Sequence, residues 1–157
     1  MIIVDQNTLD VLVTESKSSP RQRKNKNYHA EDADPLQRML NAFEPASYIC
    51  PHKHQDPDKR ELFVILTGRM LVLEFDEVGE ITSHIILDHA AGVFSAEIAP
   101  RAYHACYALE PGTVVWEVKD GPYDVNVDKC FAPWAPKEGD EGTAEFVQSL
   151  FERVGLA

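Results

Sequence analysis

The pair His52 and His54 is the feature of the sequence that most directly suggests chemistry. Side chains two positions apart point to the same side of an extended strand, so both imidazoles can reach one ion. Neutral imidazole is a ligand that zinc, iron, nickel and copper all accept. The pair also fits two solvent-facing histidines on an edge strand, so residues further along the chain have to decide between the two interpretations.

Glu61 is the candidate for an oxygen ligand. It lies seven residues after His54, at the start of an apolar run, and seven residues before Gly68. A carboxylate beside two imidazoles gives a mixed oxygen and nitrogen site that suits a divalent transition metal. Asp56, Asp58 or a water molecule are alternatives for the same position, because a long acidic stretch separates His54 from Glu61.

His104 is the third candidate histidine, and it follows a predicted strand that ends at Pro100. Together these positions resemble the two sequence motifs of the cupin superfamily, with Ala46 and Ala108 as departures from them. The matched positions, in chain order, are His52, His54, Glu61, Gly68, Gly92, Pro100 and His104. The resemblance implies that the three histidines and Glu61 bind one divalent metal ion, namely zinc, iron, nickel or manganese, inside a small β-barrel.

Segments outside these motifs narrow the resemblance. Over about positions 8 to 140 the chain looks like the WbuC family of cupin-fold metalloproteins. The similarity is carried by residues 19–29, 34–38, 51–54, 121–123 and 128–136. That family is associated with O-antigen and surface-polysaccharide gene clusters, so the resemblance implies a role in surface-polysaccharide biosynthesis.

A row of hydrogen-bond donors precedes all of these positions. Arginine binds carboxylate or phosphate groups, and asparagine suits sugar hydroxyls. We expect the row to line the barrel mouth and bind an anionic or hydroxyl-rich substrate, with His29 as a catalytic acid or base or as a group that supports the site. The alternative is a solvated surface strand. The residues on this face of an extended segment are Arg21, Arg23, Asn25, Asn27 and His29.

Four residues on predicted strands keep two interpretations each. Cys50 and Cys106 share the strand parity of nearby histidines. They are either thiolate ligands or, as is more usual for buried cysteine, small neutral wall residues. Glu117 and Lys119 share one face of a strand, and they either approach the pocket or pair on an outer sheet face.

Short apolar strands at regular spacing must position these residues. Runs at 62–67 and 70–75 flank Gly68-Arg69, which is a two-residue hairpin signal. Strands are also predicted over 81–87, 93–99, 103–109 and 113–119. Because strands and helices do not alternate, the fold class is all-β dominated, a single-domain cupin β-barrel (double-stranded β-helix or jelly roll) with N-terminal helices and a C-terminal helix.

The chain divides into three parts of one domain. Residues 1–45 are predicted to pack on the barrel as an extension with two helices, which begin near Asn7 and at Asp34-Pro35, and a polar strand. The second helix is inferred from the spacing of Leu36, Met39, Leu40 and Phe43. Residues 46–120 form the barrel, and residues 121–157 form a C-terminal segment and helix. In that segment Tyr123 and Trp134 close over the pocket as a lid, with Tyr123 contacting substrate, or pack the segment onto the barrel.

Composition excludes several classes of partner. The chain has 157 residues, is 44% hydrophobic and carries a formal net charge of −11. Nucleic acids and anionic membranes attract basic surfaces, so neither is an expected partner. The N-terminus does not resemble a secretory signal, and three cysteines without short spacing are a poor disulfide framework, so a cytoplasmic location is expected.

The function expected from these observations is a metal-dependent enzyme that acts on a small polar or sugar-derived molecule. The metal would polarise a carbonyl or stabilise an enediolate, as in isomerases and epimerases. An iron-dependent dioxygenase and a non-catalytic, metal-anchored binding module are the alternatives. A homodimer is expected through an outer sheet face that presents Leu62, Val64 and Leu66.

Overall fold

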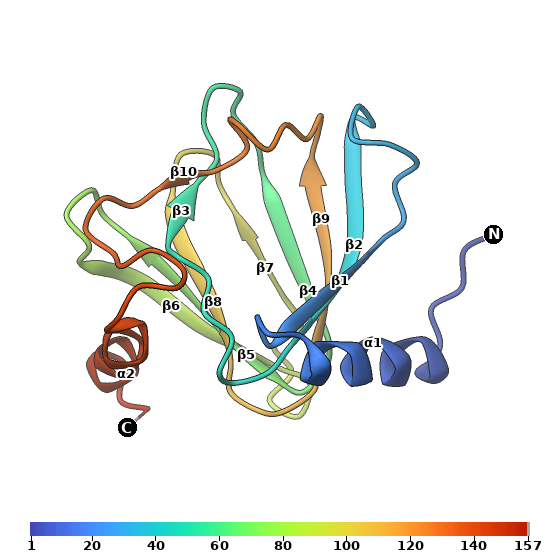
Figure 1. Ribbon diagram of the computed structural model, residues 1–157, viewed down its shortest axis with the longest axis horizontal. Coiled ribbons are helices and arrows are strands. Elements are labelled where there is room, and N and C mark those ends of the chain that lie inside the picture. Colours follow the sequence, from blue (N-terminus) through green and yellow to red (C-terminus); the bar gives the residue numbers. More distant parts are fainter. Residues whose placement is uncertain (157) are drawn as a thin grey trace.

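Two five-stranded antiparallel sheets face each other in the computed structural model, which describes residues 1–156 (Figure 1). The first sheet has the order β1 (Arg23–Asn27), β2 (Leu36–Phe43), β9 (Thr113–Asp120), β4 (Glu61–Thr67) and β7 (Ser95–Ile98). The second has the order β10 (Cys130–Phe131), β3 (His52–Lys53), β8 (Tyr103–Ala108), β5 (Arg69–Phe75) and β6 (Ile81–Asp88). The predicted β-rich class is confirmed.

Alternation along the strands divides the interior into an apolar end and a polar end. On β4, Phe63 and Ile65 point into a buried apolar cluster, together with residues such as Val115 of β9. Toward the other end of the same two strands, Glu61 stands opposite Lys119 in the register. Polar side chains therefore gather at one open end of the sandwich, where a ligand can enter.

Gly68 is a corner between the sheets, so the predicted hairpin over 62–75 is wrong. β4 pairs with β7 and β9, whereas β5 pairs with β6 and β8. Gly68 has φ +74°, and a Cβ there would lie 2.8 Å from the Thr113 Cα. The glycine correctly indicates a tight turn. The apolar runs on its two sides do not pair with each other, because each is a strand of a different sheet.

The helix predicted from Asp34-Pro35 is also wrong, because residues 36–43 form β2. This strand has both faces covered, so apolar residues occur at both parities. Leu40 is buried beneath the N-terminal helix, whereas Met39 and Phe43 face the interior. The helix-like spacing is thus the pattern of a strand that is buried on two sides.

One helix lies at each end of the chain, as expected. α1 (Gln6–Ser18) is capped by Asp5 and packs Leu9 and Leu12 on the outer face of the first sheet. α2 (Thr143–Arg153) packs Leu150 among buried aromatic residues of the second sheet. Neither helix, within residues 1–156, has the length and apolar character needed to cross a membrane.

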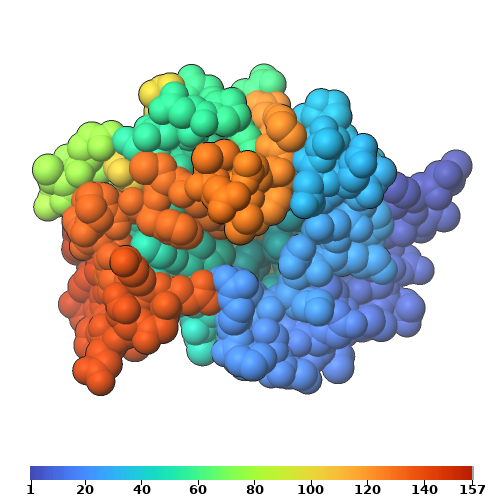
Figure 2. All heavy atoms as spheres, turned by 45° about the horizontal axis from the view of Figure 1, so that its top comes forward, coloured from blue at the N-terminus to red at the C-terminus, as the bar shows by residue number. Residues whose placement is uncertain are grey.

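Residues 121–138, here called the strap, follow β9 and lead toward the C-terminal helix. The strap crosses the open end of the sandwich and contributes β10, which pairs with β3 (Figures 1 and 2). In Figure 2 the strap, in orange, lies across the front of the molecule beside the blue N-terminal strands. It covers the polar end that the two sheets leave open.

Candidate metal centre

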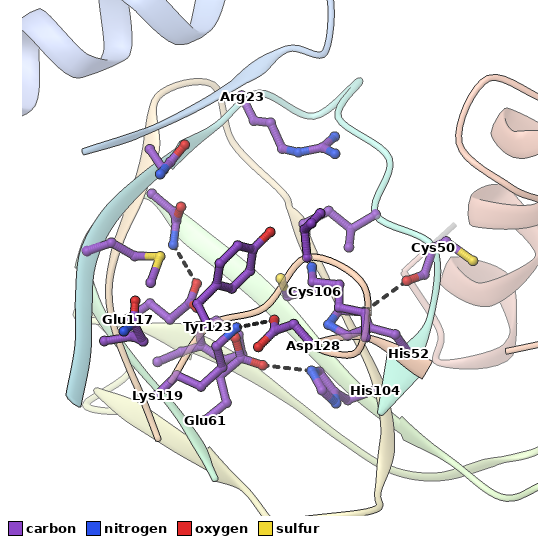
Figure 3. A pocket seen from close by; sticks show the side chains of 18 of the residues that line it. Arg23, Cys50, His52, Glu61, His104, Cys106, Glu117, Lys119, Tyr123 and Asp128 are labelled. Carbon is purple, nitrogen blue, oxygen red and sulfur yellow. Dashed lines mark hydrogen bonds and ion pairs between the residues drawn. The ribbon is translucent and has the colours of Figure 1, made fainter. Parts of the chain in front are cut away.

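Four side chains from both sheets converge beneath the strap. His52 on β3 pairs in register with His104 on β8, and His54 directly follows β3. Glu61 begins β4 in the opposite sheet. One ligand atom from each residue lies within 4.8 Å of those of the others, and all four residues are buried. The strand parity of His52 and His54 therefore produces the predicted convergence, and Figure 3 shows His52, His104 and Glu61 around one point.

The three imidazole rings are oriented by backbone carbonyls. His52 Nδ1 lies 3.0 Å from the Cys50 carbonyl oxygen, and His104 Nδ1 lies 3.1 Å from that of Ala102. His54 Nδ1 contacts the carbonyl oxygen of Asp128 in the strap. A carbonyl oxygen can only accept, so we assign the ring hydrogen to Nδ1 in each case. The Nε2 atoms are then left to bind at the centre.

The donor set fits a metal cation. Nε2 of His104 and of His54 lie 2.8 and 3.2 Å from Glu61 Oε2. Within residues 1–156, His52 Nε2 is buried without a hydrogen-bond partner. Three nitrogen lone pairs and a carboxylate thus share one small buried space. Such a set of acceptors is costly to bury unless a cation or protons lie between them.

Burial and hydrogen bonding hold two of these groups in metal-binding forms. Burial is the main reason that the pKa of His52 lies well below its ordinary value of 6.5. Burial alone would raise the pKa of Glu61, but its contacts with His104 and His54, whose Nε2 atoms take up protons when no cation lies between the groups, outweigh burial and hold that pKa well below 4.5. At neutral pH His52 is therefore neutral and Glu61 ionised.

The alternatives to Glu61 lie outside the cluster. Asp56 and Asp58 are exposed and pair with Arg101 at 2.8 and 2.7 Å. Their carboxylates are therefore turned to the surface, and the correct spacing of Glu61 to Gly68 identified the residue that enters the cluster.

A cavity of about 730 Å³ opens from this cluster. Every side chain predicted to contact a substrate or to transfer protons lines its wall. Their roles in binding and catalysis remain predictions, because β1 is also an edge strand on which Asn25 and Asn27 are exposed to solvent. These residues are Arg21, Arg23, Asn25, Asn27, His29 and Tyr123.

The arginines of this row are paired with the strap. Arg21 Nε lies 2.6 Å from Glu138 Oε1, and an Arg23 terminal nitrogen lies 2.7 Å from Glu138 Oε2. Further along the row, Asn25 donates a 2.7 Å hydrogen bond to Asn27, and the backbone N–H of Arg38 lies 3.1 Å from His29 Nδ1. The row thus forms a polar wall, with Arg23 at some distance from His104 and Glu61 (Figure 3).

Glu117 and Lys119 face the cavity rather than an outer sheet face. Asn41 donates a 2.5 Å hydrogen bond to Glu117, and Lys119 Nζ lies 2.6 Å from Asp128 Oδ2. Burial, followed by the charge of Glu61, raises the pKa of Glu117 well above 4.5. The protonated form of Glu117 is therefore favoured beside the carboxylate of Glu61.

The cysteines and Trp134 take the simpler of their predicted roles. Burial raises the pKa of the Cys106 thiol to about 12, and burial likewise raises that of Cys50. Cys106 lines the cavity as a neutral wall residue, whereas the sulfur of Cys50 points away from the cavity (Figure 3) and packs in the apolar cluster that also contains Tyr48 and Leu150. Trp134 packs against Phe75 at a ring distance of 5.1 Å, and it is not part of the cavity wall.

Four contributors were missed by sequence reasoning. Asn41 lies in the segment that was interpreted as a helix, so its inward parity was hidden. Lys59, Asp128 and Glu138 act through contacts across long stretches of chain, such as the 69 residues between Lys59 and Asp128. The similarity of residues 128–136 to a metalloprotein family was the one sequence signal that pointed to this part of the site.

Comparisons with known proteins establish the fold. The model of a family described as "Domain of unknown function (DUF6016)" matches residues 4–87. No curated protein matches the sequence significantly. An L-ribose isomerase from Cellulomonas parahominis, solved with L-psicose, is 15% identical, with 86% of this chain and 95% of that chain covered and a TM-score of 0.57.

Two further solved structures are similar. KdgF from a Halomonas species is 16% identical, with 69% of this chain and 86% of that chain covered and a TM-score of 0.51. A cupin superfamily protein from Desulfitobacterium hafniense is 14% identical, with the same coverage and a TM-score of 0.50. Identities this low show the fold alone, and the fold is that of the cupins.

Proposed function

The chain belongs to the family described as "Domain of unknown function (DUF6016)", and from the geometry of its site we propose that it is a metal-dependent enzyme acting on a small, anionic, hydroxyl-rich molecule. The proposal rests on one observation, the convergence of His52, His54, Glu61 and His104. Zinc, iron, nickel and manganese all accept such a set of nitrogen and oxygen ligands. When bound, the ion would supply Lewis-acid polarisation of a carbonyl oxygen.

The charges near the cluster favour an anionic ligand. The carboxylates of Glu61 and Asp128 are balanced by the ammonium groups of Lys59 and Lys119, and all four groups are buried. Glu117, with its raised pKa, adds no charge. A divalent cation would therefore leave the site with an excess positive charge, which an anionic ligand would neutralise.

The polar wall supports hydroxyl groups on the ligand. Asn25, Asn27 and Asn41 line one side of the cavity, and amide groups both donate to and accept from hydroxyls. His29 and Glu117, whose pKa is raised, are two of the groups lining the cavity that can give or take a proton. Together they suit proton transfer between neighbouring carbons of a sugar-derived molecule.

Isomerisation or epimerisation is the reaction that we propose first. One structure of similar fold is an L-ribose isomerase, which is the reason for proposing this reaction first. The similarity does not identify the substrate. The resemblance to the WbuC family supports a substrate from surface-polysaccharide biosynthesis in the cytoplasm. The reaction itself depends on which proton donors reach the bound molecule.

Metal analysis followed by a substrate panel tests the proposal. Tag-free protein is expected to hold one divalent ion per chain, and the loaded protein is expected to interconvert members of a panel of aldoses, ketoses and sugar acids, followed by NMR. His52→Ala should abolish both properties. His84→Ala, at an exposed histidine on β6, should leave both unchanged.

Three results would redirect the proposal. Wild-type protein that takes up no ion after incubation with each candidate metal would remove the metal centre. Stoichiometric iron with ligand-dependent oxygen consumption would support the iron-dependent dioxygenase. Tight binding of a panel member without any conversion would support the non-catalytic binding module.

A further inference from the structure

Asp128 connects the strap to the metal ligands through its backbone. Its carbonyl oxygen contacts Nδ1 of His54, the hydrogen bond that orients this ring toward the centre. The other two histidines receive the equivalent contact from Cys50 and Ala102, which lie two residues before each of them. The orientation of His54 alone depends on a segment distant in sequence, 74 residues away.

The side chain of Asp128 fixes that carbonyl in place. Lys59 Nζ lies 2.7 Å from its Oδ1 and Lys119 Nζ lies 2.6 Å from its Oδ2, and the three residues are 2–4% exposed. Lys59 also donates to the carbonyl oxygen of Pro122, at the start of the strap. Two buried lysines thus hold both ends of residues 122–128 against the barrel.

The stretch between these two anchors has little else to hold it. Val125 is 74% exposed and Val127 is 47% exposed, and Asp124 bonds mainly within its own turn. The Tyr123 N–H donates to the Asp32 carbonyl oxygen at 2.7 Å, which fixes only the beginning of the stretch. Removal of the Asp128 carboxylate would therefore free residues 124–128 and leave two buried cations without their partner.

We propose that Asp128 is a positioning residue that couples closure of the strap to metal binding. This inference rests on the proposed metal centre. In the closed strap the Asp128 carbonyl holds the His54 tautomer whose Nε2 binds, and a bound ion holds His54 where its Nδ1–H meets that carbonyl. Coupling of this kind is reciprocal, so the strap strengthens metal binding by the same factor by which metal favours the closed strap.

The affinity arm of the test compares two isosteric variants. Loss of the partner that orients a ligating histidine weakens metal binding by about 10- to 100-fold. Asp128→Asn is expected to weaken Zn²⁺ binding by this factor in a competition with a chromophoric chelator. Asp120→Asn, at a more exposed carboxylate that pairs with Arg60 at 2.9 Å, is the control and should bind Zn²⁺ like the wild type.

The exchange arm uses the wild-type protein, so it does not depend on the folding of a variant. Addition of Zn²⁺ is expected to slow amide hydrogen exchange in residues 124–128 by about the same 10- to 100-fold. Amides of α2, which packs on the far side of the second sheet, should exchange at an unchanged rate. In Asp128→Asn the effect of Zn²⁺ on residues 124–128 should disappear.

The outcomes separate this inference from the proposed function. Wild-type protein that binds Zn²⁺ while exchange at residues 124–128 stays unchanged would overturn the coupling and leave the metal centre standing. Wild-type Zn²⁺ affinity in Asp128→Asn would overturn it as well. Failure of the wild type to bind any of the candidate metals would remove both proposals together.

Discussion

Glu61 and Glu117 show how neighbouring carboxyl groups in one cavity take opposite protonation states. Glu61 faces Nε2 of His54 and His104, and its contacts with these rings, which take up protons there when no cation is bound, overcome the effect of its burial, so its pKa is low. Glu117 receives one hydrogen bond from neutral Asn41 and lies close to the charge of Glu61, so its pKa is raised. The two side chains therefore differ in role, although both are buried acids on adjacent strands.

Replacement of each acid by its amide tests this assignment. Glutamine resembles a protonated carboxyl group, so Glu117→Gln is expected to keep wild-type affinity for Zn²⁺. Glu61→Gln removes an anionic ligand and should weaken Zn²⁺ binding strongly. Loss of a residue that only orients a ligand weakens binding by about 10- to 100-fold, and the loss in Glu61→Gln should be larger. Equal affinities of the two variants, measured by chelator competition, would contradict the assignment.

The candidate ligands could be predicted because their signal is local. The alternation of His52 and His54 follows from strand geometry, and Glu61 and His104 stand at strand borders. Asn41, Lys59 and Asp128 gave no such signal, since each depends on which distant segment lies opposite. Arg23 and Glu138, for example, are 115 residues apart in sequence and still form an ion pair.

Most elements were predicted well, including β8, which is buried along its whole length, but β2 was not. The strands over 81–119 and the C-terminal helix were placed nearly at their observed bounds. β2 was interpreted as a helix because α1 covers its outer face and the cavity lies on its inner face, so its apolar residues do not alternate. The turn at Gly68 was predicted to join two paired strands, because the sequence of a strand does not show to which sheet the strand belongs.

Gly68 and Gly92 provide a matched test of the corner. Both have φ +74°, so an alanine at either position carries the left-handed cost of about 1–2 kcal/mol. A Cβ at Gly68 would meet the Thr113 backbone, whereas a Cβ at Gly92 has open space within 4 Å. Gly68→Ala should therefore lower the free energy of unfolding by clearly more than Gly92→Ala in urea denaturation. Equal losses of unfolding free energy in the two variants would mean that the close approach of Gly68 to Thr113 does not affect stability.

Glu138 predicts a pH dependence for attachment of the strap. Hydrogen bonding from Arg21 is the main reason that its pKa falls from 4.5 to about 2. The folded state thus binds this proton less tightly than the unfolded state. The ion pairs contribute their stability above about pH 4.5, and that contribution is lost as the pH falls towards 2.

A comparison with Glu138→Gln measures this contribution. The pair is partly exposed, so after allowance for solvent screening the variant should lose no more than about 1 kcal/mol of unfolding free energy at pH 7. The difference from wild type should shrink between pH 4.5 and pH 2. Glu141→Gln, at a nearby exposed acid, is the control. A difference between wild type and Glu138→Gln that stays constant down to pH 2 would contradict the assigned ion pairs.

At the scale of the whole molecule, the acidic surface and the cavity have different characters. The chain carries a net charge of −11, whereas basic and acidic side chains both line the cavity: Arg21, Arg23, Lys119, Lys129 and Lys137 together with Asp32, Glu61, Glu117, Asp128 and Glu138. A negative surface with basic groups at one opening does not attract polyanions in general. Such a charge distribution is compatible with one small anion that enters the cavity and binds there.

The outer face of the first sheet is partly covered within the chain. Val64 and Leu66 line a groove together with Ile2, Val4 and Trp116. Homodimer formation through Leu62, Val64 and Leu66 remains our proposal, and sedimentation of the wild type and of Val64→Glu would test it. A wild-type protein that sediments as a monomer would contradict it.

The central claim is that His52, His54, Glu61 and His104 hold one divalent metal ion. Anomalous scattering from crystals of tag-free protein, recorded at the manganese, iron, nickel and zinc edges, tests it most directly. We predict one ion per chain within bonding distance of the three Nε2 atoms and the Glu61 carboxylate, with a signal at one of these edges. Maps at all four edges with no peak among these atoms, from protein grown with the metals present, would contradict the claim.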